Sequence, residues 1–228
     1  MILKTIATGS TGNCYYLKAD NGEILLLDAG IPIMEIKKGI SFDVENTKGC
    51  VITHCHKDHS LSAGKVANFS PVWKPYESAN KRLRAHLGDF KIECFDLPHN
   101  GCENRGFIIE IDGQKICYMT DLEYCPYDLS DKGINILIVE CNYITELVND
   151  DLPNERHKVL GHCSLDTCIG IIKMCSKHLR GVYLAHASKG STMDKSKALN
   201  RVKEEIPAYI NCEFLKENTE YDISECPF

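Results

Sequence analysis

Three histidines and an aspartate fall within six consecutive positions of the segment VITHCHKDHS, residues 51–60. His54 and His56 are two residues apart as the chain leaves an apolar, strand-like run, so both side chains can share one metal ion. Asp58 and His59 follow directly, and a turn into a helix lets them reach a second ion beside the first. Imidazole and carboxylate ligands without thiolate suit zinc, manganese or iron. This order and spacing predicts a two-metal site rather than a solvated polar loop.

Three further ligand-type residues stand at the ends of later strand-like runs: His99 in DLPHN, Asp121 in YMTD and His186 in YLAH. Each alone is a weak signal, because a single polar residue at a strand end is often only hydrogen-bonded. A carboxylate such as Asp121 can bridge two ions about 3.5–4 Å apart, with a shared water or hydroxide between them. We therefore expect Asp121 to join two groups of ligands. The first is His54, His56 and His99, and the second is Asp58, His59 and His186.

The elements that must position these residues are short and mixed. Strand-like runs alternate with turns, and the dipeptides Asn21-Gly22 and Asp112-Gly113 predict antiparallel hairpins. Helices are expected at residues 31–39, 60–69 (capped by Ser60), 76–87, 164–178 and 192–206. Strands and helices occur in two similar halves, which predicts two sheets packed face to face with helices outside. Loops at the strand ends would then hold the chemistry.

Length and composition indicate one folded domain over residues 1–228, without linkers or repeats. The N-terminus lacks the apolar core of a signal peptide, and no run approaches the roughly 20 apolar residues of a membrane span. We therefore expect a cytoplasmic protein with no membrane partner. Thirteen cysteines, none in a C-x-x-C pair, are expected to be mostly buried free thiols. Cys55 and Cys163 each adjoin a histidine of interest and are expected to pack rather than ligate.

The formal net charge of −6 argues against a protein that holds nucleic acid mainly by a strong overall positive field. A local basic groove remains compatible with it, on the helix expected at residues 76–87 and its flanks. The cations of that groove are Lys74, Lys81, Arg82, Arg84 and Lys91. A solvated helix face is the alternative interpretation.

Taken together, the sequence resembles the metallo-β-lactamase-fold hydrolases over essentially its whole length. The five family motifs occur in order as Asp28, HCHKDH, His99, Asp121 and His186. The resemblance implies an α/β fold, the four-layer αβ/βα sandwich. It also implies that Asp28 lies beneath the metal loop and orients it by hydrogen bonding.

Two residues outside the ligand set indicate which hydrolase this is. Glu140 ends the apolar run NILIVE, and His162 stands in VLGHCS before an expected helix. They resemble the Glu–His pair of phosphodiesterase branches of the superfamily, in which the histidine protonates the leaving alkoxide. A structural salt bridge is the alternative. The resemblance therefore assigns catalytic roles to Asp58, Glu140 and His162, with a hydroxide shared by two divalent ions, zinc or manganese (or iron), as nucleophile.

Within that branch, ATGSTGN, VECNY, GHCS and YLAHAS are most similar to the YycJ (WalJ) type of exonuclease. The resemblance implies a nucleic-acid phosphodiesterase. A cyclic-nucleotide phosphodiesterase, like phage enzymes that destroy cyclic signals, is the alternative, and a metal-loaded binding or redox protein is a third. Substrate contacts are expected from four residues: Ser10, Asn13, Asn142 and Ser188. A homodimer is compatible with the sequence.

Overall fold

The structure is a computed structural model and describes residues 1–77, 83–149, 151 and 159–225. Its first sheet has the strand order β13-β1-β2-β3-β4-β5. These strands are β1 (Ile2–Ala7), β2 (Cys14–Lys18), β3 (Ile24–Leu27), β4 (Thr47–Val51), β5 (Val72–Trp73) and β13 (Thr219–Asp222). Neighbours from β13 to β3 pair antiparallel, whereas β3, β4 and β5 are parallel. The sheet therefore joins the start of the chain to its last described strand.

The second sheet has the order β12-β11-β10-β9-β8-β7-β6. Its strands are β6 (Arg84–Leu87), β7 (Phe90–His99), β8 (Cys102–Ile111), β9 (Gln114–Met119), β10 (Ile136–Glu140), β11 (Gly181–Ala185) and β12 (Asn211–Phe214). Strands β6 to β9 form an antiparallel meander, and β9 to β12 are parallel. Both predicted hairpins are confirmed, with Gly22 and Gly113 at positive φ in the turns.

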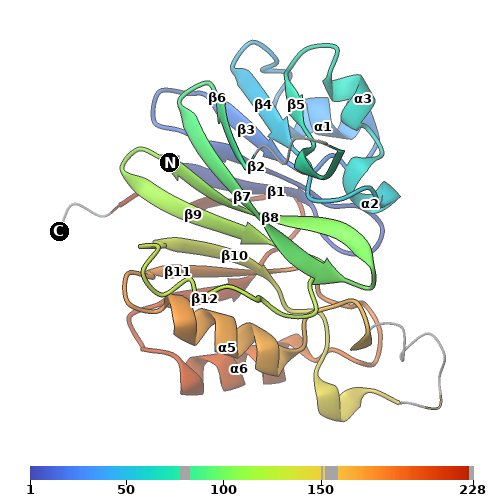
Figure 1. Cartoon of the computed structure of the whole chain (residues 1–228), viewed down its shortest axis with the longest axis vertical. Coiled ribbons are helices and arrows are strands. Elements are labelled where there is room, and N and C mark those ends of the chain that lie inside the picture. The colour runs from blue at the N-terminus through green and yellow to red at the C-terminus, as the bar shows by residue number, and fades with distance from the viewer. Residues whose placement is uncertain (78–82, 150, 152–158, 226–228) are drawn as a thin grey trace.

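Helices cover the outer face of each sheet, and the two sheets pack against each other in the middle (Figure 1). The first sheet carries α1 (Ile33–Gly39), α2 (Lys57–Ser60) and α3 (Ala63–Val66). The second carries α5 (Leu165–Cys175) and α6 (Lys195–Glu205), and short 3₁₀ turns lie at Pro75–Glu77 and Thr145–Leu147. One apolar cluster fills the space between the sheets, and two others lie beneath the helices. The four-layer αβ/βα sandwich is confirmed.

The prediction of a helix at residues 76–87 is wrong for the part of that range that the structure describes. Pro75–Glu77 forms a single 3₁₀ turn, and β6 pairs with β7 across a turn in which Gly88 has φ +59°. Side chains along β6 alternate between exposed and buried, which is the strand period. The long, charged residue types of this segment favour a helix locally, but sheet pairing overrides that preference. Lys81 and Arg82 lie outside the described residues.

The prediction of a helix at residues 60–69 is only partly correct. Two short helices replace it, and Ser60 is the last residue of α2 rather than a cap. Its hydroxyl donates to the carbonyl oxygens of Cys55 and His56, which tightens the loop before α2. None of the helices that the structure describes is long and apolar enough to cross a membrane. Nine of the twelve described cysteines are buried, as predicted.

Candidate metal centre

The predicted ligands gather at one end of the sandwich, where the strands that carry them finish. His99 is the last residue of β7, Asp121 lies two residues after β9, and His186 directly follows β11. Residues 54–59 follow β4 and enter the first turn of α2. The packing of the two sheets therefore brings together side chains that lie up to 132 residues apart (186 − 54).

The first group of donor atoms belongs to His54, His56, His99 and Asp121, and all of them lie within 4.8 Å of one another. Nδ1 of His56 lies 3.0 Å from Nε2 of His54 and 3.2 Å from Nε2 of His99. Oδ2 of Asp121 lies 3.7 Å and 3.8 Å from those two Nε2 atoms. Three ring nitrogens and one carboxylate oxygen form a four-donor set of the kind that zinc accepts.

The second group belongs to Asp58, His59, Asp121 and His186. Nε2 of His59 lies 3.5 Å from Oδ2 of Asp58 and 3.4 Å from Oδ2 of Asp121. Nε2 of His186 lies 3.8 Å from the same Asp58 oxygen. Because Oδ2 of Asp121 is close to the donors of both groups, its carboxylate has the position that a bridge between two ions requires.

Asp28 lies directly behind the second group and orients it. Its Oδ2 atom is 2.7 Å from Nδ1 of His59 and accepts a 2.6 Å hydrogen bond from the Tyr118 hydroxyl. Its Oδ1 atom accepts from the backbone N–H of Thr53. Asp28 is completely buried, so these contacts fix the ring of His59 and the strand end that leads into the loop. The resemblance implies this role for Asp28.

The other three buried rings are held in the same way, each through Nδ1. The partners are Oγ1 of Thr53 for His54 at 3.0 Å, O of Gly161 for His99 at 2.6 Å, and Oε1 of Glu140 for His186 at 2.8 Å. A hydrogen bond at Nδ1 selects the orientation of an imidazole and leaves Nε2 available as a ligand. The four buried rings therefore present Nε2 toward the centre.

Three residues of the centre adopt strained backbone conformations. Asp28, Asp121 and His186 have φ of 60°, 51° and 50°, the left-handed region that residues other than glycine rarely enter. Each comes within two residues of the end of a buried strand. Such conformations cost about 1–3 kcal/mol each and are found chiefly at functional sites. Here they turn the side chain away from the strand direction and toward the centre.

The electrostatics of the centre favour a cation. Burial, together with the neighbouring His59, lowers the pKa of His54 to about 2. Burial also acts to lower the pKa of His186, but carboxylates outweigh it, Asp121 foremost, and raise that pKa to about 10. Despite burial, the neighbouring imidazoles of His186 and His59 hold the pKa of Asp58 well below its usual range. The carboxylates thus create a field that stabilises positive charge between the rings.

The residues present fit a pair of divalent ions. Nε2 of His186 is buried and has no hydrogen-bond partner among the described residues. An unsatisfied buried nitrogen costs about 1–3 kcal/mol, which coordination to a metal would offset. Both groups contain only imidazole and carboxylate donors, a composition that suits zinc, manganese or iron.

Glu140 and His162 meet beside the two groups. Oε1 of Glu140 lies 2.7 Å from Nδ1 of His162 and 2.8 Å from Nδ1 of His186, and Oε2 accepts from two backbone N–H groups. Glu140 is fully buried, whereas the His162 side chain is 19 % exposed. Although burial acts in the opposite direction, the Glu140 carboxylate raises the pKa of His162. Glu140 therefore positions two histidines, and of these only His162 is partly exposed to solvent.

Asn13 and Asn142 both lie at the centre, but their side-chain amides donate hydrogen bonds within the protein. The side-chain amide of Asn13 donates to O of Gly9 and lies 3.0 Å from Nε2 of His59. That of Asn142 donates to O of His186 at 2.8 Å. Both side chains are buried. In this geometry both amides stabilise the loops to which they donate. A direct substrate contact stays a prediction.

Of the two serines, Ser188 lies closer to the candidate ligands. It is half-buried and lines a cavity that His186 also lines. Its Oγ accepts a hydrogen bond from the N–H of Gly190. Ser10 is exposed on the turn between Gly9 and Gly12, and that turn is closed by a backbone hydrogen bond. Of the two serines, Ser188 is therefore the better placed for a substrate contact, because it lines a cavity together with the candidate ligand His186.

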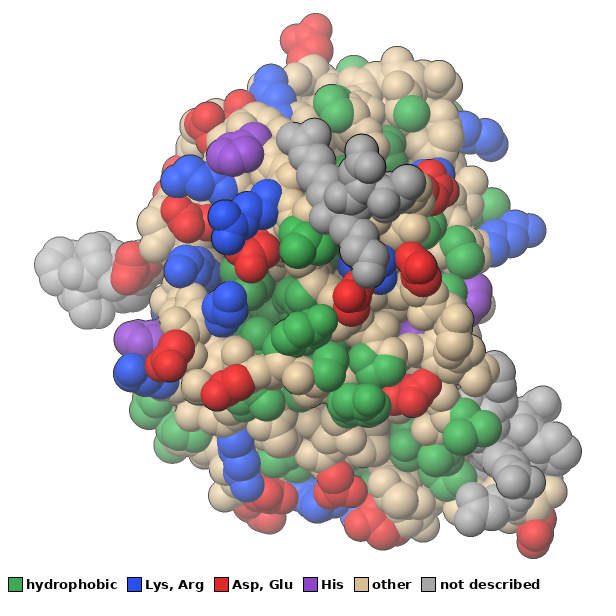
Figure 2. Space-filling model, in the orientation of Figure 1, with side chains coloured by type: hydrophobic (Ala, Val, Ile, Leu, Met, Phe, Trp, Pro, Cys, Tyr) green, Lys and Arg blue, Asp and Glu red, His purple; other side chains and the backbone are tan. Residues whose placement is uncertain are grey.

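The basic groove expected on a helix is not present as such among the described residues. Arg84 and Lys91 lie on β6 and β7, where they pair with Glu93 and Glu110 at 3.1 and 3.0 Å. Lys74 pairs with a neighbouring glutamate. Cationic and acidic side chains are interspersed on this face of the molecule (Figure 2). These cations form a mixed, internally neutralised surface and no single-sign stripe.

Sequence reasoning missed the partners that hold the rings. Thr53 directly precedes His54, and Tyr118 lies three residues before Asp121, but neither has a distinctive sequence signal. Gly161 contributes only its carbonyl oxygen, which no side-chain pattern reveals. Also missed was the proximity of two thiols next to the ligands: the Sγ atoms of Cys55 and Cys102 lie 3.8 Å apart.

Comparison with known proteins agrees with this geometry. Residues 7–93 match the family model of the metallo-beta-lactamase superfamily. The chain is similar to exodeoxyribonuclease YycJ of Bacillus anthracis, with 25 % identity over 82 % of this chain and 83 % of that protein. The resemblance inferred from the motifs is thereby confirmed.

Solved structures share the fold at low sequence identity. The metallo-beta-lactamase fold protein YhfI from Bacillus subtilis superposes with a TM-score of 0.75 at 14 % identity, covering 96 % of this chain and 98 % of that one. The short form of human tRNase Z gives a TM-score of 0.68 at 15 % identity, covering 99 % and 100 %. Both likenesses establish the fold of this chain.

Proposed function

We propose, for a chain with the metallo-β-lactamase fold, that this protein is a two-metal phosphodiesterase that cleaves nucleic acid. The observation that carries the proposal is the 2.7 Å contact between Glu140 and His162, beside both groups of ligands. Phosphodiester hydrolysis needs charge neutralisation, an activated water and an acid for a poor leaving group. The ligand groups account for the first two needs, and the Glu140–His162 pair accounts for the third.

The two ions, when bound, would neutralise phosphoryl oxygens and lower the pKa of a water molecule. The four buried rings that would hold the ions are each fixed by a hydrogen bond at Nδ1. Asp58 differs from the buried ligands because its side chain is 27 % exposed. Its low pKa keeps it ionised, so its carboxylate can accept a hydrogen bond from the attacking water and orient it.

His162 is the proposed general acid. Glu140 holds its Nδ1 atom, which leaves Nε2 as the ring nitrogen available to substrate. The raised pKa keeps the ring protonated nearer to neutral pH. As the bond between phosphorus and the leaving oxygen breaks, the proton on Nε2 passes to that oxygen. Glu140 acts through His162 and is a positioning residue.

The similarity to exodeoxyribonuclease YycJ supports a nucleic-acid substrate over the second candidate, a cyclic nucleotide. That second candidate is favoured by one observation: the cations on β6 and β7 are paired with glutamates, and a single nucleotide needs no extended basic path. A binding or redox role has less support, because it leaves the contact between Glu140 and His162 beside the ligands without a use.

The test is a hydrolysis screen with manganese or zinc supplied. The substrates are 5′-phosphorylated duplex and single-stranded DNA, RNA, and 3′,5′-cyclic purine and pyrimidine nucleotides, with Asp58→Ala protein as the blank. We expect release of mononucleotides from DNA ends. Cleavage of cyclic nucleotides with intact polymers would establish the second candidate, and no hydrolysis of any substrate would overturn the proposal.

His162→Ala tests the proposed acid separately. We expect both metals to be retained and kcat to fall about 10²–10⁴-fold, the usual effect of losing a general acid. Metal content is measured by elemental analysis alongside the rate. His86→Ala, an exposed histidine on β6, is the matched control and should leave both unchanged. An unchanged rate for His162→Ala would show that the Glu140–His162 pair is a structural salt bridge.

A further inference from the structure

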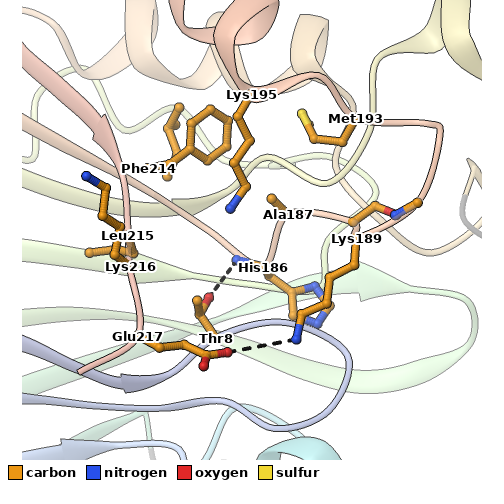
Figure 3. Close-up of a pocket in the computed structure, with 13 residues that line it drawn as sticks. Thr8, His186, Ala187, Lys189, Met193, Lys195, Phe214, Leu215, Lys216 and Glu217 are labelled. Atoms are coloured by element: carbon orange, nitrogen blue, oxygen red, sulfur yellow. Dashed lines mark hydrogen bonds and ion pairs between the residues drawn. The ribbon is translucent and has the colours of Figure 1, made fainter. Parts of the chain in front are cut away.

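A cavity of about 550 Å³ opens on the flank of the candidate metal centre (Figure 3). It is formed by the loop after β11, the start of α6, the end of β12 with the segment after it, and Thr8, which directly follows β1. Thr8 ties it to the centre, because its Oγ1 accepts a hydrogen bond from the backbone N–H of His186. Because His186 itself lines the cavity, the cavity adjoins the second group of candidate ligands.

The cavity is positively charged, in a protein whose formal net charge is −6. Lys189, Lys195 and Lys216 line it, against one acidic residue, Glu217. Figure 3 shows Nζ of Lys195 pointing into the opening. Among the described residues Lys195 has no carboxylate partner, and its ammonium lies 5.4 Å from the centre of the Phe214 ring. An unneutralised ammonium facing a cavity is a contact for an anion.

Lys189 can turn to the same anion. Its Nζ lies 3.8 Å from Oε1 of Glu217, and both side chains are more than half exposed. An exposed ion pair at this distance is weak and is readily exchanged for a stronger partner. Lys189 therefore lines the cavity and is only weakly paired with Glu217.

Apolar side chains line the same cavity beside the lysines: Leu184, Met193, Phe214 and Leu215. A cavity lined by both cationic and apolar side chains fits a nucleotide, which has both an anionic phosphate and a flat, apolar base face. Its volume lies within the range typical for small-molecule sites.

We propose that this cavity binds the nucleotide next to the scissile bond and that Lys195 and Lys189 hold its phosphate. This inference rests on the proposed function and specifies its substrate: a phosphodiester that carries a second phosphate one nucleotide away. A cyclic mononucleotide has only the phosphate under attack, so it would offer no second phosphate to either lysine. The cavity thus favours a nucleic-acid end over a cyclic nucleotide.

The test compares three dinucleotides, pdTpdT, dTpdTp and dTpdT, which differ only in the presence and side of the second phosphate. Binding is measured by calorimetry on the Asp58→Ala protein, and hydrolysis is measured on the protein with Asp58 intact. We expect one phosphorylated form to bind at least about tenfold more tightly than dTpdT, the effect of a charge-assisted contact. Lys189→Gln/Lys195→Gln should abolish that preference.

Two further variants keep the result independent of folding. Glu217→Gln frees Lys189 and should tighten binding of the preferred form about two- to fivefold, a gain that damage cannot mimic. Lys177→Gln/Lys203→Gln removes two exposed lysines outside the cavity and should preserve the preference. Bis(4-nitrophenyl) phosphate, which has no second phosphate, should be hydrolysed equally by the protein with and without Lys189→Gln/Lys195→Gln.

The outcomes separate the two proposals. Equal affinity for all three dinucleotides, or a preference that survives Lys189→Gln/Lys195→Gln, would overturn the assignment of the cavity even if the protein cleaves DNA. Absence of hydrolysis of every phosphodiester would overturn the proposed function instead. A preference lost equally in Lys177→Gln/Lys203→Gln would assign the effect to overall charge and also overturn the cavity site.

Discussion

At the scale of the residue, the centre depends on close approaches that only particular side chains allow. Gly30 follows Asp28 and packs against the loop that carries Asp58 and His59. A Cβ atom on Gly30 would lie 1.6 Å from O of Asp58 and 2.7 Å from N of His59. Both neighbours are backbone atoms, so the conflict cannot be relieved by turning a side chain. The distance between these two segments is therefore set by the absence of a side chain at position 30.

Gly30→Ala should displace the first turn of α2 and with it two candidate ligands. We expect weaker metal binding, a large loss of activity and a decrease of about 1–3 kcal/mol in the free energy of unfolding. Metal titration and urea denaturation measure these effects. Gly64→Ala, in α3, is the control, because its Cβ would meet no atom within 4 Å. Metal affinity in Gly30→Ala equal to that of the unchanged protein would contradict this account.

At the scale of the element, α5 links helix stability to the proposed acid. Its N-cap is Ser164, whose Oγ accepts a 3.1 Å hydrogen bond from N–H of Thr167. His162 lies only two residues before this cap. We expect Ser164→Ala to destabilise the protein by about 1 kcal/mol and to lower kcat by loosening His162. Ser164→Asp, which keeps a capping oxygen, should restore both, as measured by urea denaturation and steady-state kinetics. Loss of stability with unchanged kcat would show that the cap and the acid are independent.

The elements also show how far the sequence alone can be taken. The ligand run and the strand-end residues were predictable, because their chemistry requires particular residue types at particular spacings. The helix at residues 76–87 was not, because β6 is a strand only through its pairing with β7. The contact between Cys55 and Cys102 depends on segments that the sheets bring together. The same is true of the lysines that line one cavity. Such contacts have no local sequence signal.

At the scale of the whole molecule, the candidate ligands come from both sheets, so bound metal ions would join the two sheets. The first sheet supplies residues 54–59, and the second supplies His99, Asp121 and His186. A ligand that binds only the folded state at 100 times its Kd stabilises it by about 2.7 kcal/mol. Removing the ions with a chelator should therefore lower Tm by about 5–10 °C, since each kcal/mol corresponds to about 2–4 °C at this size.

The same experiment has an internal control. Asp121→Asn removes the bridging charge, so its Tm should respond little to the chelator or to restored zinc or manganese. His86→Ala should respond as fully as the unchanged protein. Equal sensitivity of Asp121→Asn and the unchanged protein would show that the ions bind elsewhere or do not join the sheets.

The positions of the ligands along the chain also determine the order in which they become available during synthesis. Synthesis runs from the N-terminus, so a growing chain acquires residues 54–59 early and His186 last among the seven. Until β11 has formed beside β10, the second group lacks one donor, and the second sheet lacks the strand end that presents it. Two complete sets of candidate ligands would thus be available only after the two halves of the chain have packed together.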